Sequence, residues 1–436
     1  MDNWGDAYPL HRILPKGRGG GRSVGLRAEG EAEVYLPGRS AAGEYIEELE
    51  MTRVKLSASP EPPRVEVLGV AVRPLAPRPV MALDAAKPLE ALGIYKHDYY
   101  AYLFDVPAPG EYRIRVNDYA VALGRGPAAA GALWLSARLE PGEAVVVAES
   151  TGHPNDGLAP HFTGLLAPLL YGPSGSAELA FEYGVVELGE YRPGLAATHS
   201  RTALLNRHMF EATPKGWGPA RELRDFTGVI YARARFRRAG KYAVLRITRS
   251  SPALGGWRIF GVLVNGRRAY LGRDGVVYIP PELLRDGENE VVVAWPEYGF
   301  SGRLELEAVV EFYEGAAEPK ALAVLEPVGE LRPAELPVEL EGPAEVVVRF
   351  RAAAKPDVVA PLYLELDGDF NAQIFLNGRL IGRYYGEGSQ RRFYLPEPYL
   401  TELNEVRLRA LPLRAGARLS ASIGAYFAAQ VVELRP

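Results

Sequence analysis

Short apolar runs alternate with turn residues along almost the whole chain. Runs rich in Val, Leu, Tyr and Phe recur about every eight to twelve residues and are separated by Gly, Pro and Asp, which is the spacing of antiparallel sandwiches and barrels. Examples are residues 65–72, 229–236, 304–312 and 344–350. Helical periodicity is confined to two short pieces, at residues 40–51 and 281–285. The pattern therefore predicts an all-β chain with several antiparallel sheets.

Proline and charge suggest where one β unit ends and the next begins. Residues 75–79 (LAPRP) and 315–319 (GAAEP) resemble linkers, and residues 189–194 (GEYRPG) form a further break. These breaks predict an N-terminal β segment over residues 1–80. They also predict three larger β units, over residues 81–188, 189–315 and 316–436.

Two stretches of the chain are versions of one another, at residues 256–293 and 368–408. In both, an apolar run meets Asn-Gly, a Gly-Arg follows, a Tyr-(Ile/Leu)-Pro strand end comes next, and Asn-Glu opens a last strand. Both central residues of a type I′ turn need positive φ, which Asn tolerates and Gly adopts freely. Asn265-Gly266 and Asn377-Gly378 are therefore predicted hairpin turns. Glycines shortly after them, Gly272 and Gly382, would allow a bulge.

A fainter third copy surrounds Asn117. This residue precedes Gly124-Arg125 at the separation that Asn265 has from Gly272-Arg273. Three copies of the unit fit the length of the chain.

Composition describes a globular chain without an obvious charged partner. Of 436 residues, 47% are apolar and 24% charged, and the net charge is −4, so there is no basic excess to neutralise the phosphates of a nucleic acid. No apolar run approaches the roughly 20 residues that span a bilayer, and the first residues show no signal peptide. We expect a cytoplasmic protein that binds neither nucleic acid nor membrane. Abundant proline with scarce glutamine is typical of thermophiles, although a GC-rich genome has a similar effect.

Particular residues of the repeat resemble a known family. The matching residues are Phe375-Leu-Asn-Gly378, Leu380-Ile-Gly-Arg-Tyr-Tyr385, Tyr394-Leu-Pro396 and Asn404-Glu405. They resemble the non-catalytic jelly-roll domains of glycoside hydrolase family 35 β-galactosidases. Residues 97–102, 152–157 and 183–190 resemble upstream segments of that family, in the same order. The resemblance covers residues 90–310 together with the last unit, and it implies several galactose-binding-like jelly-roll domains in tandem.

The sequence offers no catalytic centre that fits this resemblance. Members of the family carry two catalytic glutamates on a TIM barrel, and nothing before residue 90 supplies one. Glu44, Glu47, Glu48 and Glu50 have the spacing of a solvated helical face, while Asn289-Glu290 and Asn404-Glu405 are expected to cap turns. Cysteine is absent and no pair of the six histidines has metal-ligand spacing. We expect no catalytic residue in this chain and no cofactor, with a structural calcium ion left open.

Aromatic side chains are the better candidates for function. Flat rings bind the C–H side of a pyranose, while polar groups at the rim bind its hydroxyls. A loop with two histidines and an aspartate could hold a sugar or a metal, or could be a hydrogen-bonded loop core. The aromatic candidates could instead close the ends of the sandwiches. The candidate residues for binding a carbohydrate or a partner are Arg383, Tyr384, Tyr385, Trp257, Trp295, Tyr298, His153, Asn155 and Asp156.

The leading hypothesis is an accessory subunit. It would associate with a separate catalytic glycosidase subunit and help to form a site for a terminal β-galactosyl or related sugar. One alternative is a free-standing carbohydrate-binding module. Another is a structural assembly protein that binds no sugar.

Overall fold

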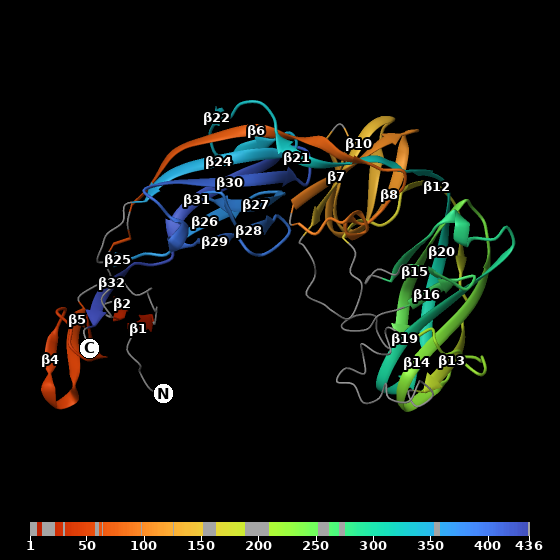
Figure 1. The fold of residues 1–436 in the computed structure, drawn as a ribbon, viewed down its shortest axis with the longest axis horizontal. Helices are drawn as coiled ribbons and strands as arrows, with labels where there is room; N and C mark the ends of the chain where they lie inside the picture. Colours follow the sequence, from red (N-terminus) through yellow and green to blue (C-terminus); the bar gives the residue numbers. More distant parts are fainter. Residues whose placement is uncertain are drawn as a thin grey trace. The chain divides into compact units, whose positions relative to one another are not determined.

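The protein divides into two compact units. The computed structural model describes residues 7–10, 22–28, 31–56, 61–62, 64–96, 98–124, 126–150, 163–187, 209–251, 261–269, 275–352 and 358–434. Unit 1 combines Met1–Ala76 with Glu326–Pro436, and unit 2 is Pro77–Leu325 (Figure 1). Unit 1 is therefore built from both ends of the chain.

Strands dominate the described residues, which confirms the predicted all-β class with tandem β-sandwiches. Their helical segments are four single 3-10 turns: η1 (Glu47–Leu49), η2 (Leu89–Leu92), η5 (Pro281–Leu283) and η6 (Glu397–Tyr399). Two of these turns lie in the two stretches where helical periodicity was visible in the sequence. None of the described helices is long and apolar enough to cross a membrane.

The second half of unit 2 is a sandwich of two sheets. A large core lies between them and includes Ile230, Trp295 and Phe312. One sheet has the order β13 (Glu182–Glu187), β14 (Glu222–Arg237), β19 (Glu288–Arg303), β16 (Gly261–Val264) and β17 (Arg267–Ala269). The facing strands are β18 (Val276–Ile279), β15 (Tyr242–Ser251), β20 (Glu305–Ala317) and β12 (Leu169–Glu178).

The first half of unit 2 has its own core, which includes Tyr102, Phe104 and Tyr112. Its strands are β7 (Asp98–Val106), β8 (Gly110–Leu123), β9 (Pro127–Leu139), β10 (Gly142–Ser150), β11 (Gly164–Leu165) and β21 (Pro319–Pro327). Asn117 lies inside β8, where it pairs with Gly164. The faint third copy therefore lacks the Asn turn of the other two.

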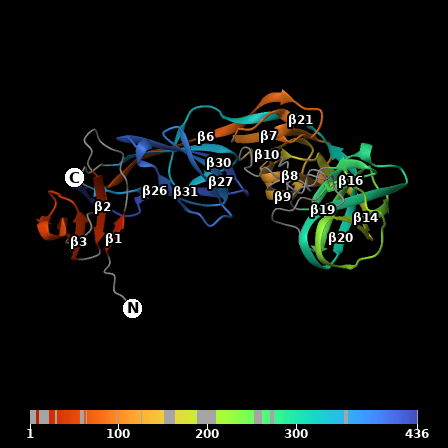
Figure 2. The same ribbon diagram turned by 60° about the horizontal axis from the view of Figure 1, so that its bottom comes forward.

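Unit 1 contains the sandwich that carries the last repeat, drawn in blue and cyan in Figure 2. Its core includes Val348, Phe370 and Leu408. The larger sheet is β22 (Arg332–Ala334), β6 (Val65–Ala82), β24 (Ala344–Ala352), β30 (Leu403–Pro412), β27 (Phe370–Leu376) and β28 (Arg379–Tyr385). The smaller sheet is β23 (Val338–Leu340), β31 (Ala417–Ala425), β26 (Leu362–Asp367) and β29 (Arg392–Leu395).

Strand β6 runs through the predicted linker at residues 75–79, where the boundary between the two compact units also lies. Residues 75–79, which resemble a linker because of their prolines, belong to this long strand. Proline is tolerated in a strand wherever the sheet does not need its missing N–H. Residues 65–74 of β6 pair with β24, so the N-terminal part of the chain supplies a strand to the last sandwich.

The remaining part of unit 1 joins the two ends of the chain. Strand β2 (Arg22–Ala28) pairs with β1 (Ala7–Leu10) on one side and with β32 (Ala429–Leu434) on the other, and β25 (Val358–Val359) completes this sheet. The residues that follow β2 in the sequence form a separate small sheet. Its strand order is β3 (Ala32–Pro37), β5 (Met51–Leu56) and β4 (Glu44–Ile46). The four glutamates at 44, 47, 48 and 50 are exposed, as a solvated face requires.

Candidate functional site

The two predicted Asn-Gly turns are present. Asn265 and Gly266 have φ of 50° and 81°, and Asn377 and Gly378 have φ of 48° and 82°. They join β16 to β17 and β27 to β28. Beside Gly382 the register of β27 against β28 shifts, which confirms the predicted bulge there. Gly272 lies outside the described residues.

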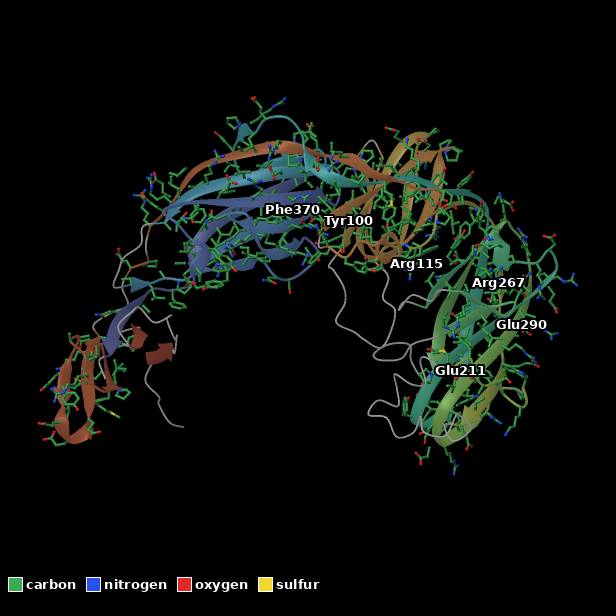
Figure 3. The ribbon with its side chains drawn as sticks, viewed as in Figure 1. Tyr100, Arg115, Glu211, Arg267, Glu290 and Phe370 are labelled. Carbon is green, nitrogen blue, oxygen red and sulfur yellow. The ribbon has the colours of Figure 1, made fainter. Side chains whose placement is uncertain are left out.

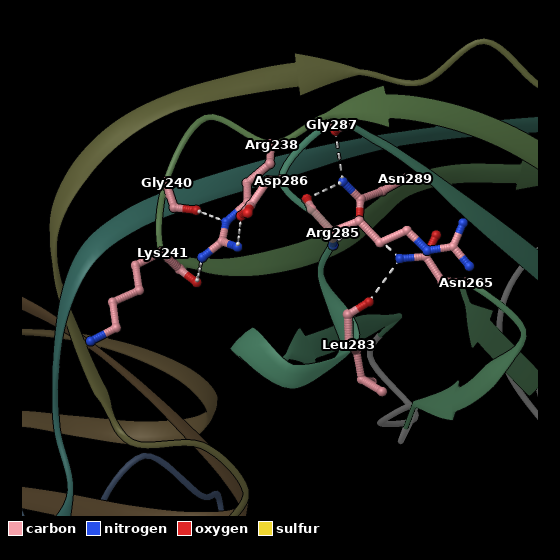
Figure 4. A network of polar contacts seen from close by, with 9 residues as sticks. All are labelled: Arg238, Gly240, Lys241, Asn265, Leu283, Arg285, Asp286, Gly287 and Asn289. Atoms are coloured by element: carbon pink, nitrogen blue, oxygen red, sulfur yellow. Dashed lines mark hydrogen bonds and ion pairs between the residues drawn. The ribbon is translucent and has the colours of Figure 1, made fainter.

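In unit 2 the turn asparagine is held by a second asparagine (Figure 4). The side-chain amide of Asn265 donates to the Leu283 carbonyl at 2.8 Å and to Oδ1 of Asn289 at 2.9 Å. The amide of Asn289 donates in turn to the Arg285 and Gly287 carbonyls, both at 3.1 Å. Asn289 is fully buried, so its polar atoms need these partners.

Unit 1 repeats this arrangement almost bond for bond. The amide of Asn377 donates to the Tyr399 carbonyl at 2.7 Å and to Oδ1 of Asn404 at 3.0 Å. Asn404 also accepts the backbone N–H of Thr401 and donates to its carbonyl, both at 2.7 Å. The N–H of Glu405 donates to Oδ1 of Asn377 at 2.8 Å. The Asn-Glu pairs therefore fix turns, as predicted, and belong to the scaffold.

Replacing Asn404 by alanine should lower the free energy of unfolding by about 2–3 kcal/mol. Asn404 is buried, and the change removes its hydrogen bonds to Asn377 and to the Thr401 backbone, each worth about 0.5–1.5 kcal/mol. Urea unfolding of Asn404→Ala beside the exposed control Glu402→Ala measures this loss. Equal stability of the two variants would contradict a structural role for the asparagine pair.

Two of the aromatic candidates are core residues. Tyr384, on β28, is fully buried, its hydroxyl donates to the Gly368 carbonyl at 2.9 Å, and its ring centroid lies 4.6 Å from that of Phe370. Figure 3 labels Phe370 in the sandwich of unit 1. Burial raises the pKa of the Tyr384 hydroxyl. Trp295 is likewise fully buried in the core of unit 2. Neither ring is on the surface, so neither presents a face to a sugar.

The other candidates that the structure describes belong to different units. Arg383 and Tyr385 are half-buried on the face of β28 opposite to Tyr384, and they pair with Gln373 and Asn371 of β27. Tyr298 belongs to unit 2 and is 37% exposed. The remaining candidates, Trp257, His153, Asn155 and Asp156, lie outside the described residues. A carbohydrate role for any of the nine stays a prediction.

A group of exposed tyrosines lies elsewhere, on the outer face of the smaller sheet of unit 1. Along β26 the leucines at 362, 364 and 366 point into the core, so Tyr363 and Glu365 point outward. Tyr363 pairs with Tyr394 of β29 on one side and with Gly424 of β31 on the other. Glu365 pairs with Arg392. We call Tyr363, Tyr394, Tyr426, Glu365 and Arg392 the tyrosine face.

The side chains of the tyrosine face contact one another. The rings of Tyr363 and Tyr426 have centroids 4.9 Å apart and planes tilted by 59°. Arg392 lies over the Tyr363 ring at 4.6 Å and donates from Nε to Glu365 at 3.1 Å. That hydrogen bond raises the pKa of the Arg392 guanidinium, so this group keeps its charge. Tyr394 and Tyr426 are 40% and 42% exposed, so two of the three rings are open to solvent.

Gly424 makes room for this arrangement. A Cβ atom at this position would lie 2.7 Å from the Tyr363 hydroxyl oxygen and 2.8 Å from its Cζ. Such distances are too short for non-bonded atoms, so any other residue would displace the ring. The absence of a side chain at Gly424 lets the Tyr363 ring lie against the sheet.

The corresponding face in unit 2 is covered. Because Tyr278 pairs with Val244 as Tyr394 pairs with Tyr363, Val244 occupies the place of Tyr363, and Val276 that of Arg392. Val244 and Val276 are buried in a cluster with Tyr313, to which Trp134 of β9 and Leu170 contribute. Glu311 stands where unit 1 has Gly424. One copy of the fold thus buries this face against its neighbour, and the other leaves it open.

Comparison with known proteins places part of this site in a family. Residues 347–404 match the beta-galactosidase, galactose-binding domain. This segment contains four of the five residues of the tyrosine face, and it includes the Asn377–Asn404 pair. The resemblance to β-galactosidase jelly rolls is confirmed for this segment.

Solved structures of glycosidases match the chain at low identity and with low TM-scores. A beta-glucuronidase from Ruminococcus gnavus is 12% identical, with a TM-score of 0.21, over 60% of this chain and 46% of its own. A beta-glucuronidase from an uncultured Clostridium sp. is 10% identical, with a TM-score of 0.21, over 62% and 46%. A putative beta-galactosidase from Bacteroides fragilis is 13% identical, with a TM-score of 0.19, over 59% and 40%.

The chain spans about half the length, or less, of these solved structures. No curated protein matches the sequence. Among the described residues, no group of His, Asp and Glu side chains could hold a metal ion.

Proposed function

We propose that this chain is a non-catalytic carbohydrate-binding protein and that the tyrosine face of unit 1 holds the sugar. The observation that carries the proposal is an open aromatic surface inside a segment that matches a galactose-binding domain. The proposed ligand carries a terminal β-galactosyl or related residue. The tyrosine face thereby replaces the candidates that the sequence suggested on β28.

The chemistry of the tyrosine face suits a hexose. Tyrosine rings give a sugar an apolar surface for its C–H groups. The hydroxyl of Tyr394 donates to the Glu397 carboxylate, which fixes that ring at the rim. Glu365 offers carboxylate acceptors and Arg392 offers fixed N–H donors, which together match the hydroxyls of a pyranose. The ion pair between them holds both side chains in place before a ligand arrives, which lowers the entropic cost of binding.

The internal copy argues for a sugar rather than a protein as the ligand. In unit 2 the equivalent positions carry Val244 and Val276, which suit dry packing against Trp134. Unit 1 has Tyr363 and Arg392 at these positions. An arginine in the middle of a docking surface would have to be desolvated, whereas a hydroxylated ligand can bond to it. The substitutions therefore favour a polar ligand with an apolar side.

Isothermal titration calorimetry with a panel of galactosides tests the proposal. We expect saturable binding with a stoichiometry near one per chain, because the corresponding face of unit 2 is buried. Glucosides and mannosides serve as comparison ligands. Flat heats for every sugar at millimolar concentration would contradict the proposal.

A second part of the proposal concerns a partner protein. We propose that the chain associates with a separate catalytic chain of a β-galactosidase-like glycoside hydrolase and brings carbohydrate to it. Support comes from the galactose-binding domain match. Co-expression with a barrel-bearing glycosidase from the same genome, followed by size-exclusion chromatography, should give one complex. Separate elution at micromolar concentrations would contradict the association and leave sugar binding untouched.

A further inference from the structure

The outer face of the smaller sheet in unit 1 continues beyond the tyrosines. Next to Tyr363 along β26 come Glu365 and then Asp367, which pair with Ser422 and Ser420 of β31. Both serines and Asp367 are exposed. We call Glu365, Asp367, Ser420 and Ser422 the polar lane. Since a strand advances about 3.4 Å per residue, Tyr363 to Asp367 spans roughly 13 Å, about the length of a trisaccharide.

The polar lane is open and its charges are balanced. Glu365 accepts from Arg392 at 3.1 Å, and Oδ1 of Asp367 lies 3.5 Å from Nε of Arg391. Arg391 is held from the other side, where it donates to the Gly388 carbonyl at 2.9 Å and the Gly386 carbonyl at 3.2 Å. The lane therefore offers hydroxyls and paired carboxylates, with no uncompensated charge among its four residues.

We propose that the tyrosine face and the polar lane together bind a neutral oligosaccharide of about three hexose units. This inference rests on the proposed function and names its ligand class. One terminal hexose lies on the exposed rings of Tyr394 and Tyr426, beside Tyr363 and the arginine that covers its ring. The following units run along β26 and β31, where their hydroxyls bond to Ser422, Ser420 and Asp367.

Two features distinguish this ligand from a single sugar or an anionic one. The polar lane consists of two serines and two carboxylates on the outer face of a sheet. No bulky side chain among these four residues blocks a glycan that continues past Tyr363. A uronate or sulfated glycan would need a cation that is not already paired. Arg392 and Arg391, the arginines that contact the carboxylates of the polar lane, both have these carboxylates as partners, so the charge balance within the lane fits a neutral glycan.

Calorimetry with a length series tests the proposal. The probes are galactose, galactobiose, galactotriose and galactotetraose. We expect the affinity to rise at least tenfold from galactose to galactotriose and to change less than twofold on adding the fourth unit. A tri-galacturonate should bind at least tenfold more weakly than galactotriose. Equal affinities for galactose and galactotriose would overturn the proposal, and so would tighter binding of the tri-galacturonate.

A double variant separates the polar lane from the tyrosine face. In the double variant Ser420→Ala with Ser422→Ala, galactotriose should bind less than threefold more tightly than galactose. The affinity for galactose itself should stay the same. The control is Glu339→Ala, an exposed residue of the neighbouring β23, which should keep the full gain. If galactotriose still bound at least tenfold more tightly than galactose in the double variant, the additional hexose units would not lie on the polar lane, and the proposal would be wrong. Absence of binding for every probe would instead refute the proposed function, and the lane with it.

Discussion

Replacing Tyr363 by alanine is expected to weaken galactoside binding by at least tenfold, a loss of about 1.4 kcal/mol or more. Tyr363 is the centre of the tyrosine face, because it pairs with Tyr394, contacts Tyr426 and supports Arg392. Its removal takes away the surface against which Arg392 and the exposed ring of Tyr426 rest, so the groups proposed to contact the sugar lose their positions. Calorimetric titration with galactotriose measures the effect.

The matched control is Tyr35→Ala. Tyr35 lies on β3 and is 43% exposed, and its hydroxyl donates to Glu33 at 3.4 Å. We expect Tyr35→Ala to bind as the unchanged protein does. Tyr363→Ala should stay folded and lose less stability than Tyr384→Ala, because Tyr363 is only half-buried whereas Tyr384 is fully buried. Unaltered affinity in a folded Tyr363→Ala variant would refute the assignment of the sugar to this face.

The second large effect is on stability. Replacing Tyr384 by alanine should cost about 3–5 kcal/mol, because the change empties a fully buried ring position in the core of unit 1. Tyr384→Phe keeps the ring and loses the hydrogen bond to the Gly368 carbonyl, so it should cost about 1 kcal/mol. Urea unfolding monitored by circular dichroism measures the free energy of unfolding of the two variants.

The two tyrosines are expected to show opposite phenotypes. Tyr384→Phe should bind galactotriose normally, because the hydroxyl it removes is turned into the protein. Tyr363→Ala should stay folded and bind galactotriose at least tenfold more weakly than the unchanged protein. A Tyr384→Phe variant that is as stable as the unchanged protein but fails to bind would return the site to β28, where the sequence suggested it.

The turns of the fold were predictable because their causes are local. Asn-Gly between two apolar runs specifies positive φ at both residues, and both copies adopt it. The strand at residues 362–366 was also predictable, since Leu-Tyr-Leu-Glu-Leu marks a half-buried strand with Tyr363 on the outside. The grouping of Tyr363 with Tyr394 and Gly424 depends on strand pairing, which no local pattern contains.

The assignment of Tyr384 and Tyr385 needed information that the motif does not contain. A bulge beside Ile381 shifts the register between β27 and β28, and a shift of one residue exchanges the two faces of a strand. Burial of Tyr384 also depends on Phe370 and Phe393 from other strands. Counting residues after the Asn-Gly turn could not decide which tyrosine points inward.

The pairing of strands that are far apart in the sequence could not be predicted from local patterns. Arg22 pairs with Leu434, and residues of β6 pair with β24 across more than two hundred positions. Such partners are chosen by packing in the folded chain rather than by local propensity. Residues 1–80 resembled nothing recognisable, and their contribution to the last sandwich became visible only in the structure.

A crystal structure of the chain with galactotriose tests the central claim most directly. The account predicts sugar density over the exposed rings of the tyrosine face, with hydroxyls bonded to Glu365 and Arg392 and the following units along Ser422 and Ser420. Density at any other surface, with the tyrosine face bare, would contradict it.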